Sequence, residues 1–135
     1  MRIVPLAVKN YFAYGIPVEQ TIKENRDIFN FCMQLKTNST STPLYRHLVD
    51  GEIVNDKLGR MTRYLIVNKG KDSGILLKKF EDGRITGVNV GYSVKIFNKV
   101  QYLNWDDYKL DYQFYITEAN KLINPLVMKE LDLFA

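Results

Sequence analysis

The sequence predicts an α+β fold, with a small curled antiparallel sheet or partly closed barrel over about residues 61–100 and helices on both sides of it. Three observations predict this class. β-Branched residues concentrate in that stretch, five glycines punctuate it, and apolar residues recur at helical spacing before and after it. At 135 residues, 46% of them hydrophobic and 25% charged, the chain has the composition of one globular domain, residues 1–135.

Residues 1–36 are expected to be helical. Pro5 is well placed at the first position of a helix that ends near Gly15, and Pro17 can open a second helix. Asp27 can cap a third helix. The apolar residues of that third helix recur at helical spacing and are Ile28, Phe31, Cys32 and Leu35.

Residues 37–60 are expected to be loop or irregular structure. The run 36–43 holds no apolar residue before its final Pro43, which predicts an exposed loop. The run 44–59 mixes apolar residues with an Asp50–Gly51 turn signal, and it favours a ragged hairpin or a lid.

Residues 61–102 are expected to form the sheet. The apolar runs 64–67 and 75–77 are too short for helices and read as strands. Asp82-Gly83 is a hairpin signal, because glycine tolerates the positive φ of a primed turn. Apolar and polar residues alternate over 88–97, which predicts one strand with one packed face and one largely solvent-exposed face.

Residues 106–135 are expected to be helical with a C-terminal tail. Tyr112, Tyr115 and Ala119 belong to an apolar series at spacings of three and four, and Asp107 or Asp111 can cap its start. Pro125 is expected to follow the end of this helix.

Positive charge is concentrated in the predicted sheet. The net charge is 0 over residues 1–56, +7 over 57–101 and −3 over 102–135. Lys and Arg hold phosphate backbones with release of counterions, so the sheet is a candidate nucleic-acid surface. The alternative is that these lysines only solubilise and protect sheet edges. The predicted nucleic-acid-binding residues are Arg63, Lys78, Lys79, Arg84, Lys95 and Lys99.

The sequence does not favour a catalytic function. A single His, His47, cannot build a triad or a multi-His metal site, and a single Cys, Cys32, favours a buried structural thiol over a reactive nucleophile. Asp106, Asp107 and Asp111 can chelate magnesium in principle, but carboxylates at a helix start are more often caps. We therefore expect no catalytic residue, no metal and no cofactor.

The segment 1–5 lacks the features of a signal peptide, and no apolar run approaches the roughly 20 residues of a membrane span. A cytoplasmic location, in a bacterial host if the gene is phage-encoded, is the expectation.

Five stretches of the chain carry a resemblance to a known family: residues 11–32 (YFAYGIPVEQTIKENRDIFNFC), 63–67, 77–84, 90–98 and 110–119 (LDYQFYITEA). They resemble the C-terminal region of phage-type family B DNA polymerases, past the palm. The resemblance covers about four-fifths of the chain. It implies a thumb-like piece that grips a primer–template duplex through its backbone. The metal-binding, exonuclease and nucleotide-binding signatures of that family are not found in this chain.

The C-terminus carries a second resemblance. Glu130, Leu131, Asp132, Leu133 and Phe134 resemble the peptide that binds bacterial sliding clamps, whose pattern begins with Gln rather than Glu. In such a peptide Leu131, Leu133 and Phe134 would fill an apolar groove. The alternative is that these side chains pack onto the domain itself.

The predicted function is therefore a non-catalytic DNA-binding module of replication that also tethers a sliding clamp. Its partners would be duplex or primer–template DNA and the clamp, with no membrane. The alternative is a small phage or mobile-element protein that binds and inhibits or modulates a host protein. It would use residues 44–59 or a helical face for that contact. The oligomeric state is left open.

Overall fold

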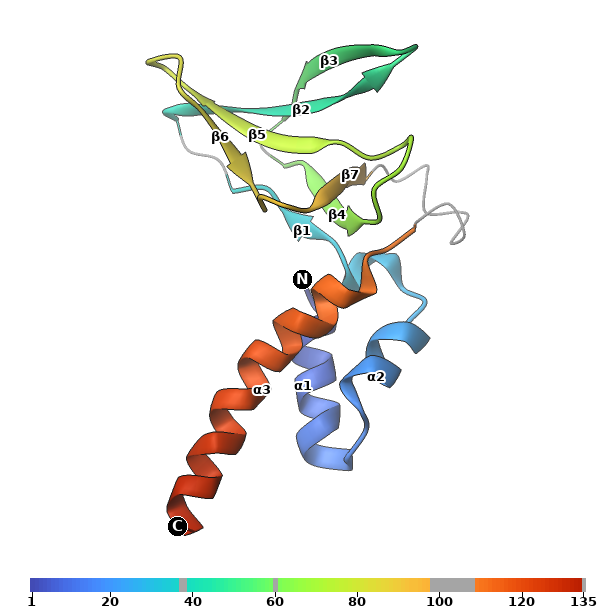
Figure 1. Cartoon of the computed structure of the whole chain (residues 1–135), viewed down its shortest axis with the longest axis vertical. Coiled ribbons are helices and arrows are strands. Elements are labelled where there is room, and N and C mark those ends of the chain that lie inside the picture. The colour runs from blue at the N-terminus through green and yellow to red at the C-terminus, as the bar shows by residue number, and fades with distance from the viewer. Residues whose placement is uncertain (37–38, 60, 98–108, 135) are drawn as a thin grey trace. The chain divides into compact units, whose positions relative to one another are not determined.

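The helices and strands follow one another in the order shown in Figure 1, a computed structural model that describes residues 1–36, 39–59, 61–97 and 109–134. The chain divides into two compact units, Met1–Phe31 with Asp111–Ala135, and Cys32–Leu110. The α+β class with helices flanking a small sheet region is confirmed. That the two units form one domain stays a prediction. Among the described residues, no helix is both long enough and apolar enough to cross a bilayer.

The first unit is built from three helices. They are α1 (Ile3–Tyr14), α2 (Val18–Glu24) and α3 (Tyr112–Phe134). Gly15 ends α1 in the left-handed conformation at φ 66°, as predicted, and its N–H bonds back to the carbonyl of Tyr11. α3 packs against both shorter helices. At the centre, the fully buried Tyr115 hydroxyl donates to the Phe31 carbonyl at 2.9 Å.

Two helix predictions are wrong. After Asp27 the chain makes only a 3₁₀ turn, η1 (Ile28–Asn30), and then enters β1 (Met33–Gln34), because residues 33–34 pair with β4 instead of continuing a helix. Asp27 does act as a cap, accepting from the Phe29 N–H at 3.0 Å. At the other end of the chain, α3 runs through Pro125 to Phe134 rather than ending before the proline.

The second unit contains two antiparallel sheets. The three-stranded sheet has the order β1-β4-β7 and the four-stranded sheet the order β3-β2-β5-β6, and neither closes into a barrel. The partly closed barrel is therefore not formed. The strands besides β1 are β2 (Ser41–Val49), β3 (Glu52–Lys57), β4 (Arg63–Val67), β5 (Ile75–Phe80), β6 (Ile85–Val88) and β7 (Ser93–Phe97).

The segment expected to be irregular, 37–60, supplies a regular hairpin. β2 and β3 pair from Leu44↔Lys57 to Val49↔Glu52, and Asp50 and Gly51 make the turn with positive φ. Ser41–Pro43, expected in a loop, belongs to β2 because it pairs with the end of β5. The Asp50–Gly51 turn signal is thus confirmed, and the residues on both sides of it form regular strands.

The alternating run 88–97 is not one strand. Asn89 at φ 52° and Gly91 at φ 90° reverse the chain between β6 and β7, which belong to different sheets. Asn is among the few residues that adopt this conformation readily, so the turn is built from residues suited to it. The Asn89 amide also donates to the buried Tyr64 hydroxyl at 2.8 Å. Burial raises the Tyr64 pKa, and this hydrogen bond opposes that rise.

The two sheets share a core. Tyr45 and Leu76 are paired across β2 and β5, so they lie on the same face of the four-stranded sheet, and both are buried. The Tyr45 hydroxyl reaches the Val94 carbonyl in β7 at 2.9 Å. Gly74 also bridges to Val94. This buried side of the four-stranded sheet is called the inner face.

Candidate nucleic-acid interface

A lysine-lined pocket lies beside the end of β4. It has a volume of about 330 Å³, which is at the small end of ligand pockets. The turn after β4 forms one wall. There Ser73 Oγ accepts from the Gly70 N–H at 3.0 Å and donates to the Gly70 carbonyl at 2.9 Å, which holds Lys71 and Asp72 at the apex.

Three lysines from three separate segments line this pocket: Lys71, Lys95 and Lys109. Lys71 is in the turn, Lys95 is on β7 opposite Leu65, and Lys109 precedes the Leu110 bridge to Val67. The Asn68 N–H donates to the Lys109 carbonyl at 2.7 Å, which fixes that backbone beside β4. We call this set the lysine pocket.

One carboxylate, that of Asp72, also lines the lysine pocket. Its charge contributes to the electrostatics of Tyr45, whose pKa is raised to about 12, first by burial and then by Asp72. Among the residues that the structure describes, the charged side chains of the lining therefore sum to +2. A site of this charge suits an anionic group such as a phosphate.

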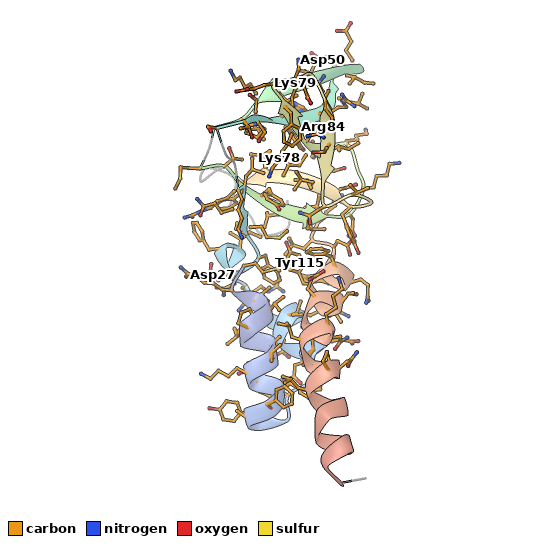
Figure 2. All side chains as sticks on the ribbon, turned by 90° about the vertical axis from the view of Figure 1, so that its left-hand side faces the viewer. Asp27, Asp50, Lys78, Lys79, Arg84 and Tyr115 are labelled. Atoms are coloured by element: carbon orange, nitrogen blue, oxygen red, sulfur yellow. The ribbon has the colours of Figure 1, made fainter. Side chains whose placement is uncertain are left out.

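The cations predicted on β5 and its hairpin do not share one face. Lys78 and Lys79 are adjacent on β5, so they point to opposite faces of the four-stranded sheet. Arg84 lies across from Phe80, where the Phe80 N–H donates to the Arg84 carbonyl, and its guanidinium lies 4.6 Å from the Phe80 ring centroid. Figure 2 labels all three cations on the strand-bearing unit. Lys78 and Arg84 thus belong to one face and Lys79 to the other.

The remaining predicted cations divide differently. Arg63 pairs with Phe97 and Lys95 with Leu65, which puts Arg63 and Lys95 on the same face of the three-stranded sheet. Of the predicted residues that the structure describes, Lys95 alone lines the lysine pocket. Lys99 lies outside the described residues. DNA binding by each of these side chains stays a prediction.

Sequence reasoning did not select Lys71 or Lys109 as site residues. Lys71 was counted only within the basic excess, and Lys109 lies in a segment of negative net charge. Their proximity depends on the antiparallel bridge between Val67 and Leu110, residues 43 positions apart. The Gly70–Gly74 turn was the only local signal that could have drawn attention to Lys71.

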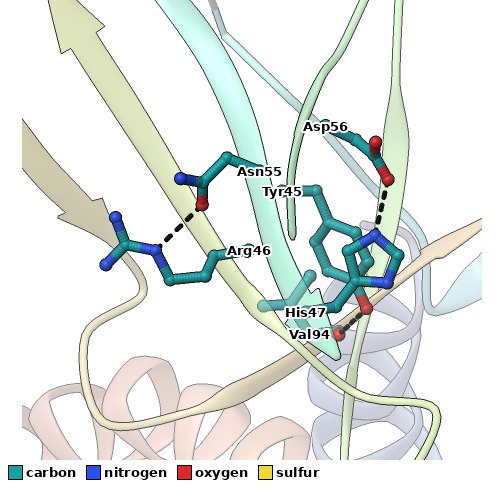
Figure 3. Close-up of polar contacts among 6 residues, drawn as sticks. All are labelled: Tyr45, Arg46, His47, Asn55, Asp56 and Val94. Atoms are coloured by element: carbon teal, nitrogen blue, oxygen red, sulfur yellow. Dashed lines mark hydrogen bonds and ion pairs between the residues drawn. The ribbon is translucent and has the colours of Figure 1, made fainter. Parts of the chain in front are cut away.

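His47 belongs to a polar cluster on β2 and β3. Its ring stacks on Tyr45 with centroids 4.6 Å apart, and its Nε2 pairs with the Asp56 carboxylate (Figure 3). On the opposite side of β2, Arg46 Nε donates to Asn55 Oδ1 at 2.9 Å. Within the described ranges no group of three His, Cys, Asp or Glu side chains is arranged to hold a metal ion.

Three further sequence predictions concern Cys32, the aspartates and the C-terminal peptide. Cys32 is buried, as expected. Asp111 caps α3, because its carboxylate accepts from the Phe114 N–H at 3.2 Å, while Asp106 and Asp107 lie outside the described residues. The peptide 130–134 forms the last turn of α3. Clamp binding by that peptide stays a prediction.

Comparison of the chain with protein-family models, with curated proteins and with solved structures gave no match. The polymerase resemblance therefore stays a prediction.

Proposed function

We propose that this protein is a non-catalytic DNA-binding module of replication, whose strand-bearing unit holds the phosphate backbone. The observation that carries the proposal is the convergence of Lys71, Lys95 and Lys109 on one pocket. The unit 32–110 has thirteen basic and eight acidic residues, whereas the rest of the chain has six and seven. Backbone contacts of this kind position a protein on DNA without reading its sequence.

The lysine pocket is the proposed centre of the contact. Lys71 and Lys109 are exposed and Lys95 is half-buried, so the three ammonium groups are presented at the surface without full loss of hydration. Arg63, Lys78 and Arg84 are proposed as outlying phosphate contacts. The C-terminal peptide, Glu130–Phe134, is proposed to tether a sliding clamp.

Fluorescence anisotropy of labelled duplex, primer–template and single-stranded DNA at several salt concentrations tests the DNA proposal. We expect the logarithm of the affinity to fall linearly with the logarithm of salt concentration, with similar affinities for unrelated sequences. Lys71→Glu with Lys109→Glu should lower the affinity at least tenfold and reduce the salt slope by about 1 for each lost phosphate contact.

Lys23→Glu is the matched control, because Lys23 is an exposed lysine of α2 in the other unit. It changes the net charge in the same direction without touching the pocket. Equal losses from Lys23→Glu and from a single pocket variant would show that only net charge matters. Absence of DNA binding at low salt would refute the proposal.

The clamp tether needs a separate measurement, with purified bacterial sliding clamp and surface plasmon resonance. Leu133→Ala with Phe134→Ala should abolish clamp binding and leave DNA affinity unchanged. Binding that persists in this double variant, or its absence in the unaltered chain, would refute the tether but not the DNA contact.

A further inference from the structure

The side of the four-stranded sheet opposite the inner face exposes aliphatic side chains. Strand pairing assigns Leu48 and Ile53 of the β2–β3 hairpin to this side, together with Ile75 of β5 and Ile85 of β6. Their exposed fractions are 60%, 71%, 51% and 45% respectively. Scattered single exposures are ordinary, but four aliphatic residues on one sheet face form a surface. We call this surface the aliphatic face.

A pocket of about 460 Å³ adjoins the aliphatic face. Ile75, Gly87, Val90 and Tyr92 are among its lining residues, as is Lys69. A Cβ built on Gly87 would lie 2.9 Å from the Val90 side chain, so the glycine lets Val90 pack closely against β6 at the edge of this pocket. Val90 is 81% exposed. The apolar surface therefore continues from the strands into a hollow that can accept a side chain.

The charges on the aliphatic face have one sign. The pairing register assigns Arg46, Lys57 and Lys79 to it. None of the β2, β3, β5 and β6 residues on this side is acidic, whereas Glu52 and Asp56 of β3 belong to the inner face. Arg46 is paired with Ile75 and Lys79 with Ile85, so each of these cations lies beside an exposed aliphatic residue. A partner that covers this surface must therefore place apolar groups and carboxylates next to one another.

The geometry points to a docking site for an acidic amphipathic segment of a partner protein. Aliphatic side chains cannot stack on bases as aromatic rings do, and they gain nothing from a phosphate backbone. The aromatic rings of β2 and β5, Tyr45 and Phe80, belong to the inner face, and the described aromatic ring beside the aliphatic face is that of Tyr92 in the adjoining pocket. Apolar side chains of a protein segment would remove these aliphatic groups from water, and its carboxylates would meet the cations.

The test selects binders from a displayed library of random 16-residue peptides on the full chain. Enriched peptides should carry net negative charge and apolar residues at helical or alternating spacing. One enriched peptide, synthesised and labelled, then serves as the probe in anisotropy titrations. Lys57→Glu with Lys79→Glu, and separately Ile53→Gln with Ile75→Gln, should each weaken its binding at least tenfold.

Matched controls are available for both changes. Leu122 of α3 is 50% exposed, a fraction similar to the 51% of Ile75. Leu122→Gln therefore changes an equally exposed aliphatic residue outside the aliphatic face. Lys23→Glu is the control for the charge variants, because it reverses an exposed positive charge outside the aliphatic face. Both controls should bind the probe within twofold of the unaltered chain, and all variants should retain its thermal unfolding temperature within a few degrees.

Four outcomes would overturn the inference. They are the failure of acidic amphipathic peptides to enrich, equal binding of the probe to the face variants, loss of DNA affinity in Ile53→Gln with Ile75→Gln, and self-association that the face variants abolish. The third would make the surface a nucleic-acid contact and the fourth an interface between copies. Lys71→Glu with Lys109→Glu should keep the peptide and lose DNA, which separates this inference from the proposed function.

Discussion

The Tyr45 hydroxyl donates a 2.9 Å hydrogen bond to the Val94 carbonyl oxygen, and this bond joins the inner face of the four-stranded sheet to β7 of the three-stranded sheet. Tyr45 is 8% exposed. The same carbonyl also accepts from the Gly74 N–H at 2.8 Å. The Val94 carbonyl therefore joins the two sheets through two hydrogen bonds, one from a buried side chain and one from the backbone.

Stability should fall at high pH because of Tyr45. Its pKa is raised from 10.0 to about 12 in the folded protein, by burial and by the charge of Asp72. A raised pKa means that folding favours the neutral phenol. The free energy of unfolding is therefore unaffected by ionisation of Tyr45 below pH 10. It falls by about 2–3 kcal/mol in total as the pH rises from 10 to about 12 and beyond. Urea unfolding of the unaltered chain and Tyr45→Phe between pH 8 and 12 measures it.

The Tyr45→Phe variant should lose about 0.5–1.5 kcal/mol at pH 8 and show a shallower decline above pH 10. Tyr14→Phe, at a 70% exposed position, controls for the loss of any tyrosine. Parallel pH profiles for the unaltered chain and Tyr45→Phe would contradict the assignment.

Gly74→Ala should destabilise the strand-bearing unit. The new Cβ would lie 2.6 Å from the Arg46 carbonyl oxygen and 2.7 Å from the Tyr45 ring, and backbone cannot yield as a flexible side chain can. Overpacking of this kind costs about 1–3 kcal/mol. Gly59→Ala, with nothing within 4 Å of its new Cβ and no positive φ, should change the unfolding free energy little. Equal effects would show that Gly74 is not tightly enclosed.

Tyr115→Phe should destabilise the helical unit. The hydroxyl is fully buried and donates to the Phe31 carbonyl at 2.9 Å, so its removal takes a buried donor from that carbonyl. We expect a loss of about 1–2 kcal/mol in the free energy of unfolding, measured by urea titration. Tyr14→Phe should be neutral. A neutral Tyr115→Phe would mean that the Phe31 carbonyl is satisfied in another way.

Pro125→Ala should stabilise α3. Proline has no N–H to donate to the Lys121 carbonyl, and inside a helix it is about 3 kcal/mol less favourable than alanine. We expect a larger helical circular dichroism signal and slower hydrogen exchange of the amides that follow residue 125. Asn124→Ala, a neighbouring exposed position, should have a much smaller effect. An unchanged signal in Pro125→Ala would contradict a helix continuous through this residue.

Local sequence signals correctly predicted several helix ends, caps and strands. Gly15 predicted the end of α1, Asp27 and Asp111 predicted caps, and the apolar runs at 64–67 and 75–77 predicted β4 and β5. These features depend on the φ of one residue or on side chains a few positions apart. The sequence by itself therefore determined the α+β class and the start or end of several elements.

The tertiary structure decided what depends on pairing between distant segments. Met33–Gln34 became a strand through pairing with Tyr64 and Arg63, and the run 88–97 divided between two sheets. Pairing also brought Lys71, Lys95 and Lys109 to one pocket, whereas Lys78 and Lys79 point to opposite faces because side chains alternate along a strand. Composition reports how many cations a segment has, whereas strand register decides which of them share a face.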